Sequence, residues 1–221
     1  AKTIGVPLAK IAARIMAGET LASFKIAEPN YDHIAVKEAV FPFARFPDVD
    51  IILGPEMKST GEVMGLDRDF GHAFAKAQLA SGGMLPASGR VFISVKDRDK
   101  AHAIALGKKL IALGFSLVAT RGTARDMRAQ GLEVETINKV LEGQPHIVDA
   151  ITDGKIALVI NTTEGAKSIA DSFSLRRTAL IRKVPYATTI AGARAMVEGI
   201  SALATSGIDV APLQSYSSQP Y

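Results

Sequence analysis

The second half of the sequence predicts an α/β fold built on a parallel sheet. Helical patterns separate five short apolar segments that are typical of strands, at residues 91–95, 115–119, 132–138, 156–161 and 184–186. One of these patterns places Ala103, Leu106 and Leu110 on one face of a helix. Such an alternation of strands and helices predicts a five-stranded parallel sheet covered by helices on both faces.

The first 80 residues show a different pattern, typical of a smaller α+β unit. Residues 8–16 carry apolar side chains at helical spacing, residues 34–41 alternate with a period of two, and residues 69–80 return to helical spacing. Residues 54–65 (GPEMKSTGEVMG) are rich in glycine but match no phosphate-binding motif, so we interpret them as a loop.

Small residues, glycines and a proline in residues 81–89 (SGGMLPASG) predict a linker between the two parts. The predicted organisation is therefore a first domain at 1–80, this linker, and a second domain at 90–221. The chain begins at Ala1 directly before a helical pattern, and we expect it to be a piece of a longer protein. A processed N-terminus is the alternative.

Composition narrows the class of protein. The 26 Lys and Arg residues exceed the 22 Asp and Glu residues by a small margin that is spread along the chain, which favours small anions over nucleic acid as ligands. The sequence has no cysteine, so disulfides, thiolate metal sites and cysteine nucleophiles are excluded. No apolar run approaches the roughly 18 residues of a membrane span. We expect a soluble, cytoplasmic protein without a membrane partner.

Polar residues follow four of the predicted strands. Hydroxyl, amide and cationic side chains occur in residues 96–100, 120–123, 138–139 and 161–165. Ligands of parallel sheets bind where strands end and helices begin, and a phosphate needs such donors together with one or two cations. Threonine and asparagine are also common helix caps, so each of these residues alone has a second explanation. The four strand ends together predict an anion site.

A catalytic centre is not predicted. The 4 histidines lie in unrelated contexts, no spacing suggests a metal site, and no Gly-x-Ser-x-Gly or dinucleotide-binding motif occurs. Donors without an evident base or nucleophile indicate a binding site. Glu38 is a separate feature, because it shares one strand face with Val36 and Val40. A carboxylate on an apolar face must meet a cation, hydrogen-bond donors or a ligand. The alternative is that this face of the strand is the solvated one.

Several motifs resemble one family. The segment FPFARFPDVDIILGPEMKSTGEVMG (41–65), the turn ATRGTA (119–124), the segment INKVLEGQPHIVDAI (137–151) and the loop VINTTEG (159–165) resemble the large subunit of carbamoyl-phosphate synthase. The resemblance covers essentially the whole chain. It implies the end of the second ATP-grasp half, followed by a Rossmann-like allosteric domain of the methylglyoxal-synthase type.

The family makes carbamoyl phosphate from bicarbonate, glutamine-derived ammonia and two ATP, for arginine and pyrimidine synthesis. The resemblance thus implies ATP, Mg²⁺ (or Mn²⁺) and K⁺ as cofactors of the full-length subunit, and a glutaminase small subunit as partner. The remainder of the large subunit and further copies of the chain, through the C-terminal domain, are also expected partners. We expect this chain alone to be inactive and without a cofactor, because it starts after the family's metal-binding Glu-x-Asn segment.

The resemblance also implies a nucleotide effector, UMP or IMP, held by its phosphate. The residues that match the family's site are Ser94, Lys100, Thr120, Arg121, Thr123, Lys139, Asn161, Thr162, Thr163 and Asp171. Arg121 stands where related sequences often have histidine. A second effector, ornithine, is expected between the two domains, near Glu38 and Thr188. Ala187 replaces the family's acidic residue there, which puts ornithine binding in doubt.

Two other functions are compatible with the same fold. Methylglyoxal synthase acts on dihydroxyacetone phosphate and needs a carboxylate base near the phosphate loop. The corresponding segment reads Gly143-Gln144-Pro145-His146 and has no acid before Asp149. The other alternative is a purely structural or oligomerisation module.

Overall fold

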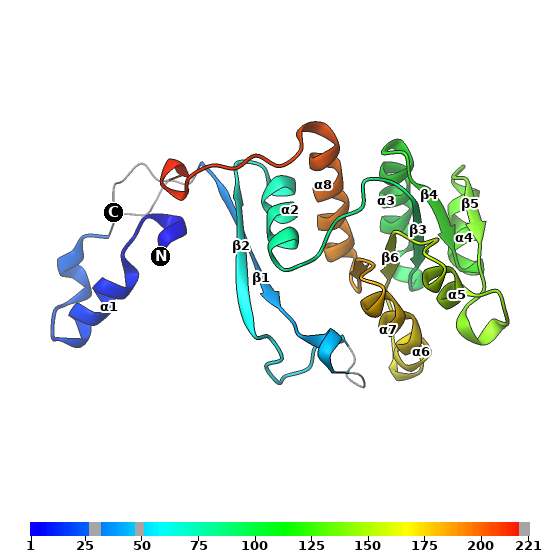
Figure 1. The fold of residues 1–221 in the computed structure, drawn as a ribbon, viewed down its shortest axis with the longest axis horizontal. Coiled ribbons are helices and arrows are strands. Elements are labelled where there is room, and N and C mark those ends of the chain that lie inside the picture. Colours follow the sequence, from blue (N-terminus) through cyan, green and yellow to red (C-terminus); the bar gives the residue numbers. More distant parts are fainter. Residues whose placement is uncertain (27–31, 47–50, 217–221) are drawn as a thin grey trace.

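A computed structural model describes residues 1–26, 32–46 and 51–216. Helix α1 (Leu8–Met16) lies at one end of the long axis of the molecule and the larger sheet at the other (Figure 1).

The larger sheet confirms the prediction of five parallel strands. It contains β3 (Arg90–Ser94), β4 (Ser116–Ala119), β5 (Val134–Thr136), β6 (Leu158–Asn161) and β7 (Tyr186–Ala187). Their order is β5-β4-β3-β6-β7 and every neighbouring pair is parallel. The crossover helices are α3 (Lys100–Ala112), α4 (Arg121–Ala129), α5 (Ile147–Thr152), α6 (Ala166–Asp171) and α7 (Phe173–Ile181), and α8 (Ile190–Ser206) follows β7.

Helices cover both faces of this sheet because apolar side chains alternate along its buried strands. Val91 and Ile93 of β3 lie in one core with residues of α3, α4 and α8. Phe92 points to the opposite face, into a second core with residues of α5 and α7. The burial of apolar side chains on both faces of β3 therefore stabilises the domain.

The first part of the chain forms an antiparallel pair of strands and two helices. β1 (Ile34–Val40) pairs with β2 (Gly61–Asp67), and α2 (Phe70–Ala80) follows β2 directly. The interpretation of residues 54–65 as a loop is therefore wrong for its second half. Residues 61–65 form a strand because their backbone pairs with β1, despite two glycines in the segment.

Helix α2 lies between the β1/β2 pair and α8 (Figure 1). Glycines allow both contacts. A Cβ atom at Gly65 would lie 2.0 Å from the carbonyl oxygen of Ala73 on α2, and one at Gly71 would lie 2.6 Å from the carbonyl oxygen of Glu198 on α8. The residues predicted as a linker also pack, since Leu85 is buried against the core of the larger sheet. The other residues of the predicted linker are exposed or half-buried, so the segment is anchored through Leu85.

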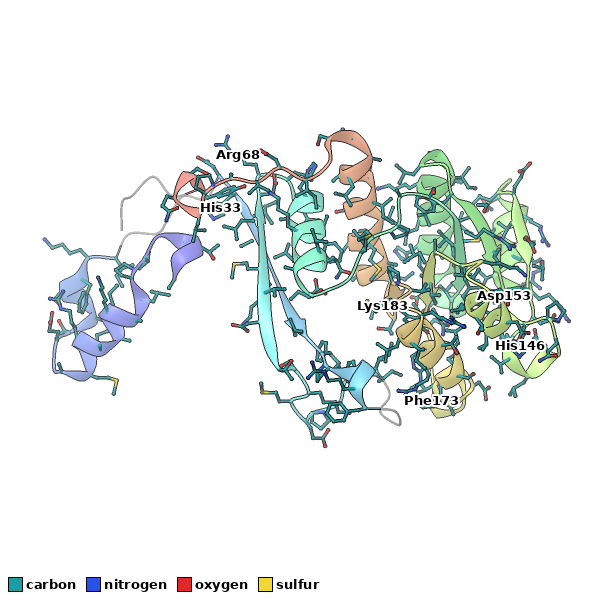
Figure 2. All side chains as sticks on the ribbon, viewed as in Figure 1. His33, Arg68, His146, Asp153, Phe173 and Lys183 are labelled. Atoms are coloured by element: carbon teal, nitrogen blue, oxygen red, sulfur yellow. The ribbon has the colours of Figure 1, made fainter. Side chains whose placement is uncertain are left out.

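The segment after α8 returns to the first part of the chain, above α2 in Figure 1. It ends in a 3-10 turn at Leu213–Tyr216. The Tyr216 hydroxyl donates to the carbonyl oxygen of Leu66 at 3.4 Å, and its ring meets the His33 ring edge-on at 5.6 Å (Figure 2). The polar sequence QSYSSQPY (214–221) is typical of a frayed end, but these contacts hold the chain as far as Tyr216. Residues 217–221 lie outside the described residues.

Within the described part of the chain, no helix combines the length and the apolar character needed to cross a membrane.

Replacing Gly65 by alanine is expected to destabilise the first part of the chain by about 3 kcal/mol, because the new methyl group meets backbone atoms of α2 and the helix must move away from β2. Gly61 on the same strand is the matched control, since a Cβ atom there meets nothing within 4 Å. Urea unfolding followed by circular dichroism measures both variants. Equal unfolding midpoints for Gly65→Ala and Gly61→Ala would contradict the close contact.

Candidate anion-binding site

The strand order places a topological switch point at the end of β3. From β3 the chain moves outward through β4 and β5, and it then returns to the other side of β3 to form β6. The loops after β3 and β6 therefore leave the sheet in different directions, which is where ligands of open α/β sheets bind. Ser94 and Asn161 are register partners at this edge.

Hydroxyl groups from β3 and the β4–α4 turn meet at this switch point. Ser94 Oγ lies 3.1 Å from Thr120 Oγ1, and Thr123 Oγ1 accepts a hydrogen bond from the backbone N–H of Val95 at 3.4 Å. Thr120 precedes α4, but its side chain makes no capping hydrogen bond. Thr189 shows the contrast, because it caps α8 through the N–H of Gly192 at 3.0 Å. The capping explanation thus holds for Thr189 but not for Thr120.

The end of β6 adds a third loop to the group. The backbone N–H of Thr162 donates to the carbonyl oxygen of Ser94 at 3.1 Å, and Thr162 Oγ1 accepts from the N–H of Lys96 at 3.2 Å. Asn161 Nδ2 donates to the Tyr186 hydroxyl at 2.7 Å. Four of these polar residues, Thr120, Thr123, Asn161 and Thr162, are buried. The loops after β3, β4 and β6 are therefore joined by their own polar groups.

Lys100, the first residue of α3, supplies the cation of the group. A Cβ atom at Gly122 would lie 4.0 Å from Lys100 Nζ, so the ammonium group lies against the Thr120–Thr123 turn. It bonds the carboxylates of Asp126 at 2.6 Å and Asp97 at 2.8 Å. These hydrogen bonds, with Asp126 first, raise the pKa of Lys100. The hydrogen bonds from Lys100 and then Arg125 lower the pKa of Asp126.

The sequence analysis did not identify Asp97 and Asp126 as part of this group. A usable signal was present for Asp126, because it follows Thr123 by one helical turn and so lies on the same side of α4.

The other predicted effector residues lie farther out. Arg121 is the exposed first residue of α4, and Thr163 is half-buried directly after Thr162. Lys139 is exposed, and its backbone N–H donates a hydrogen bond to the Glu142 carboxylate at 2.9 Å. Asp171 is the exposed last residue of α6. The described contacts do not join the side chains of Lys139 and Asp171 to the group around Ser94.

Glu38 meets hydrogen-bond donors, as its position on an apolar face required. Its Oε1 accepts from Gln78 Nε2 at 2.7 Å and from Ser81 Oγ at 3.1 Å. Its Oε2 is buried without a hydrogen-bond partner among the described residues. Thr188 is exposed after β7, and the preceding Ala187 is buried in the core of the larger sheet. The described contacts do not join Thr188 to Glu38.

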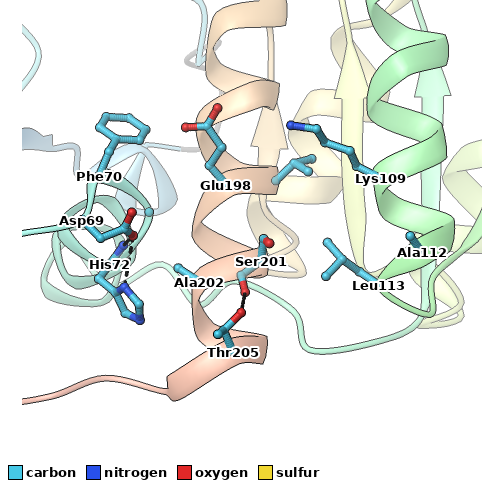
Figure 3. Close-up of a pocket in the computed structure, with 12 residues that line it drawn as sticks. Asp69, Phe70, His72, Lys109, Ala112, Leu113, Glu198, Ser201, Ala202 and Thr205 are labelled. Atoms are coloured by element: carbon cyan, nitrogen blue, oxygen red, sulfur yellow. Dashed lines mark hydrogen bonds and ion pairs between the residues drawn. The ribbon is translucent and has the colours of Figure 1, made fainter.

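A separate open cavity of about 660 Å³ lies between α2, α3 and α8 (Figure 3). It is lined by Lys109 and Leu113 at the end of α3, whereas Lys100 begins that helix. The Asp69 and His72 side chains in its wall bond each other at the start of α2. This cavity is thus distinct from the polar group at the strand ends. In the described ranges, no group of three or more histidine or acidic residues could hold a metal ion.

Comparison with known proteins supplies the family. The family model described as the MGS-like domain matches residues 102–188. Among solved structures, a methylglyoxal synthase from Elizabethkingia anophelis is 19% identical, with a TM-score of 0.42 over 51% of this chain and 79% of its own. The structure of ForH is 18% identical, with a TM-score of 0.37 over 53% of this chain and 85% of its own.

Three curated relatives share a higher sequence identity with this chain than these two solved structures do. The protein named carbamoyl phosphate synthase large chain in Mesorhizobium japonicum is 58% identical over 98% of this chain, and that in Rhizobium meliloti is 57% identical over the same share. The large chain of Myxococcus xanthus is 55% identical over 97% of this chain. This chain spans about a fifth of their length, 19%, 19% and 20% respectively. The resemblance drawn from the motifs is therefore confirmed: the chain corresponds to part of a carbamoyl phosphate synthase large chain and carries an MGS-like domain.

Proposed function

We propose that this chain is the C-terminal regulatory region of a carbamoyl phosphate synthase large chain and binds a nucleotide effector, UMP or IMP, through its phosphate. The observation that carries the proposal is that hydrogen bonds link the segments of Ser94, Thr120, Thr123 and Thr162 where β3, β4 and β6 end. The Lys100 ammonium lies beside Gly122 of the same turn.

The chemistry of this group suits a phosphate. Hydroxyl groups and a lysine are donors that phosphate oxygens accept, and the first turn of α4 adds backbone N–H groups and the positive end of the helix dipole. The Thr120 side chain makes no capping hydrogen bond, so it does not occupy the backbone N–H groups of that turn. The exposed Arg121, at the start of α4, is placed to influence which nucleotide is preferred.

The synthetic reaction belongs, in this proposal, to the rest of the large chain. There ATP, Mg²⁺ (or Mn²⁺) and K⁺ would be bound, with glutamine hydrolysis by a small subunit, in the cytoplasm. The described residues offer no carboxylate cluster for a metal ion. Exposed apolar side chains on and after α1, such as Leu8, Met16 and Leu21, are suited to contact the remainder of the large chain.

The lyase alternative lacks a suitable base at this site. His146 and Asp149, in the segment where a methylglyoxal synthase would need its carboxylate, bond each other's backbone N–H groups as the cap of α5. The carboxylates of Asp97 and Asp126 are near the site, but both bond Lys100. A regulatory role therefore fits the polar group better than a lyase role.

Replacing Thr123 by valine is expected to weaken UMP binding about tenfold, because a buried hydroxyl group is lost from the phosphate pocket while the shape of the side chain is kept. The domain should stay folded, with a loss of about 1 kcal/mol because the N–H of Val95 loses its acceptor. Thr152→Val on α5 is the control, since that exposed hydroxyl bonds only its own helix at Val148. Unchanged UMP affinity in the folded variant would reject the phosphate role of Thr123.

Parallel calorimetric titrations of this chain with UMP, IMP and dihydroxyacetone phosphate, with methylglyoxal assayed in the last case, separate the alternatives. We expect nucleotide binding without turnover. Turnover would support the lyase, and absence of binding in all three titrations would support a structural or oligomerisation module.

Ornithine is expected to bind more weakly than the nucleotide. The buried Glu38 carboxylate could receive an amine, but Ala187 supplies no second acid and lies in the apolar core. The intact large chain and its Glu38→Gln variant should therefore differ little in UMP affinity, and ornithine should bind only at much higher concentration than UMP. Ornithine binding as tight as that of UMP would contradict this expectation.

A further inference from the structure

The cations that follow β3 are already paired within the chain. Lys96 Nζ lies 3.9 Å from Asp99, Arg98 lies 3.3 Å from Glu164, and Lys100 bonds both Asp97 and Asp126. The candidate site is therefore close to charge balance before any anion arrives. An incoming phosphate must share these cations with the carboxylates of the chain itself.

Asp126 is the strongest of these competitors. Its side chain is 28% exposed and bonds Lys100 at 2.6 Å from a different element, α4, whereas the side chain of Asp97 is 95% exposed and comes from the same loop as Lys100. Solvent screens an exposed carboxylate strongly, so Asp97 affects the site less than Asp126 does. Arg125 bonds the other side of Asp126 at 2.9 Å and holds the carboxylate in place.

The position of Asp126 makes it a neighbour of the proposed phosphate. It follows Thr123 by three residues on α4, and both residues face the loop that follows β3, Thr123 through Val95 and Asp126 through Lys100. A phosphate bound between the Thr120–Thr123 turn and Lys100 would therefore lie near a carboxylate of like charge. Repulsion between the phosphate and this neighbouring carboxylate would weaken phosphate binding.

We propose that Asp126 is a built-in competitor of the effector phosphate: it holds the Lys100 ammonium in the free site and thereby sets a low affinity for phosphate monoesters. This inference rests on the proposed function, because it names the residue that tunes the same site. It assigns two tasks to the ion pair. Without effector, Asp126 satisfies the half-buried ammonium group of Lys100; with effector, it opposes binding and keeps binding readily reversible.

The test is the Asp126→Asn variant of this chain, titrated calorimetrically with UMP, IMP and inorganic phosphate. Asparagine keeps the size of the side chain and one carbonyl acceptor but removes the negative charge. All three anions should bind about tenfold more tightly, and by a similar factor, because the phosphate is common to them. Asp97→Asn should tighten binding less, by about twofold, since that side chain is screened by solvent.

Asp153→Asn is the matched control. Asp153 follows α5, where Figure 2 labels it, and bonds Lys155 at 2.8 Å outside the candidate site. This variant makes the same change in net charge and also removes an ion pair with a lysine. Its affinity for the three anions should equal that of the wild type, which separates a local effect from a general change in the electrostatic field.

A double-mutant cycle with Lys100→Met tests whether Asp126 affects phosphate binding through the Lys100 ammonium group. If Asp126 acts through the ammonium group, Asp126→Asn should give no gain in affinity once Lys100 is absent. A gain that persists in the Lys100→Met background would overturn the inference, as would unchanged or weaker binding by a folded Asp126→Asn variant. Failure of the wild-type chain to bind any of the three anions would instead overturn the proposed function, and the inference would fall with it.

Discussion

The position of β3 at the centre of the larger sheet is the constraint on which the rest of the structure depends. Because β4 pairs on one side of β3 and β6 on the other, the chain must leave the sheet in both directions at the same edge. The residues at the end of β3 can then bond partners from both neighbouring loops, as Ser94 does with Thr120 and Thr162. The two apolar faces of the strand fix this arrangement, since Val91 and Ile93 are buried on one side and Phe92 on the other.

The second structural theme is close helix packing around α2. Gly71 lets α2 approach the backbone of α8 at Glu198, and Gly199 of α8 lies against Phe74 and Leu85. Helix α2 also carries Gln78, whose side chain donates a hydrogen bond to the Glu38 carboxylate. A single helix therefore contacts both the β1/β2 pair and the larger domain, and the segment from α8 to Tyr216 connects the two parts a second time. Two connections of this kind restrict the relative motion of the parts more than a flexible linker would.

The sequence predicted the elements whose signal is local. Buried parallel strands are short apolar runs, and their ends carry recognisable polar loops, so the sheet and the polar residues at its edge could be located from the sequence; that they bind an anion stays a prediction. Features that depend on a distant partner could not. Residues 61–65 look like a loop until their pairing with β1 is seen, and the polar tail looks frayed until Tyr216 meets His33. The spacing of Asp126 from Thr123 places both residues on the same side of α4, but the pairing of Asp126 with Lys100 depends on how α3 and α4 pack.

The same contacts show how an effector could act at a distance. Lys100 is the first residue of α3, and α3 packs on α8. Helix α8 packs on α2, and α2 packs on β1, the strand that carries Glu38. Spatial continuity alone transmits nothing; an effector shifts an equilibrium only if it binds two arrangements with different affinity. Under the proposed function, the Lys100–Asp126 pair would provide a difference of this kind, because its ammonium group pairs with carboxylates of the chain in the free site and would pair with a phosphate in the bound one. The N-terminus of α3 would then be held by the ligand instead of by α4, and α3 is the helix through which the site contacts α8.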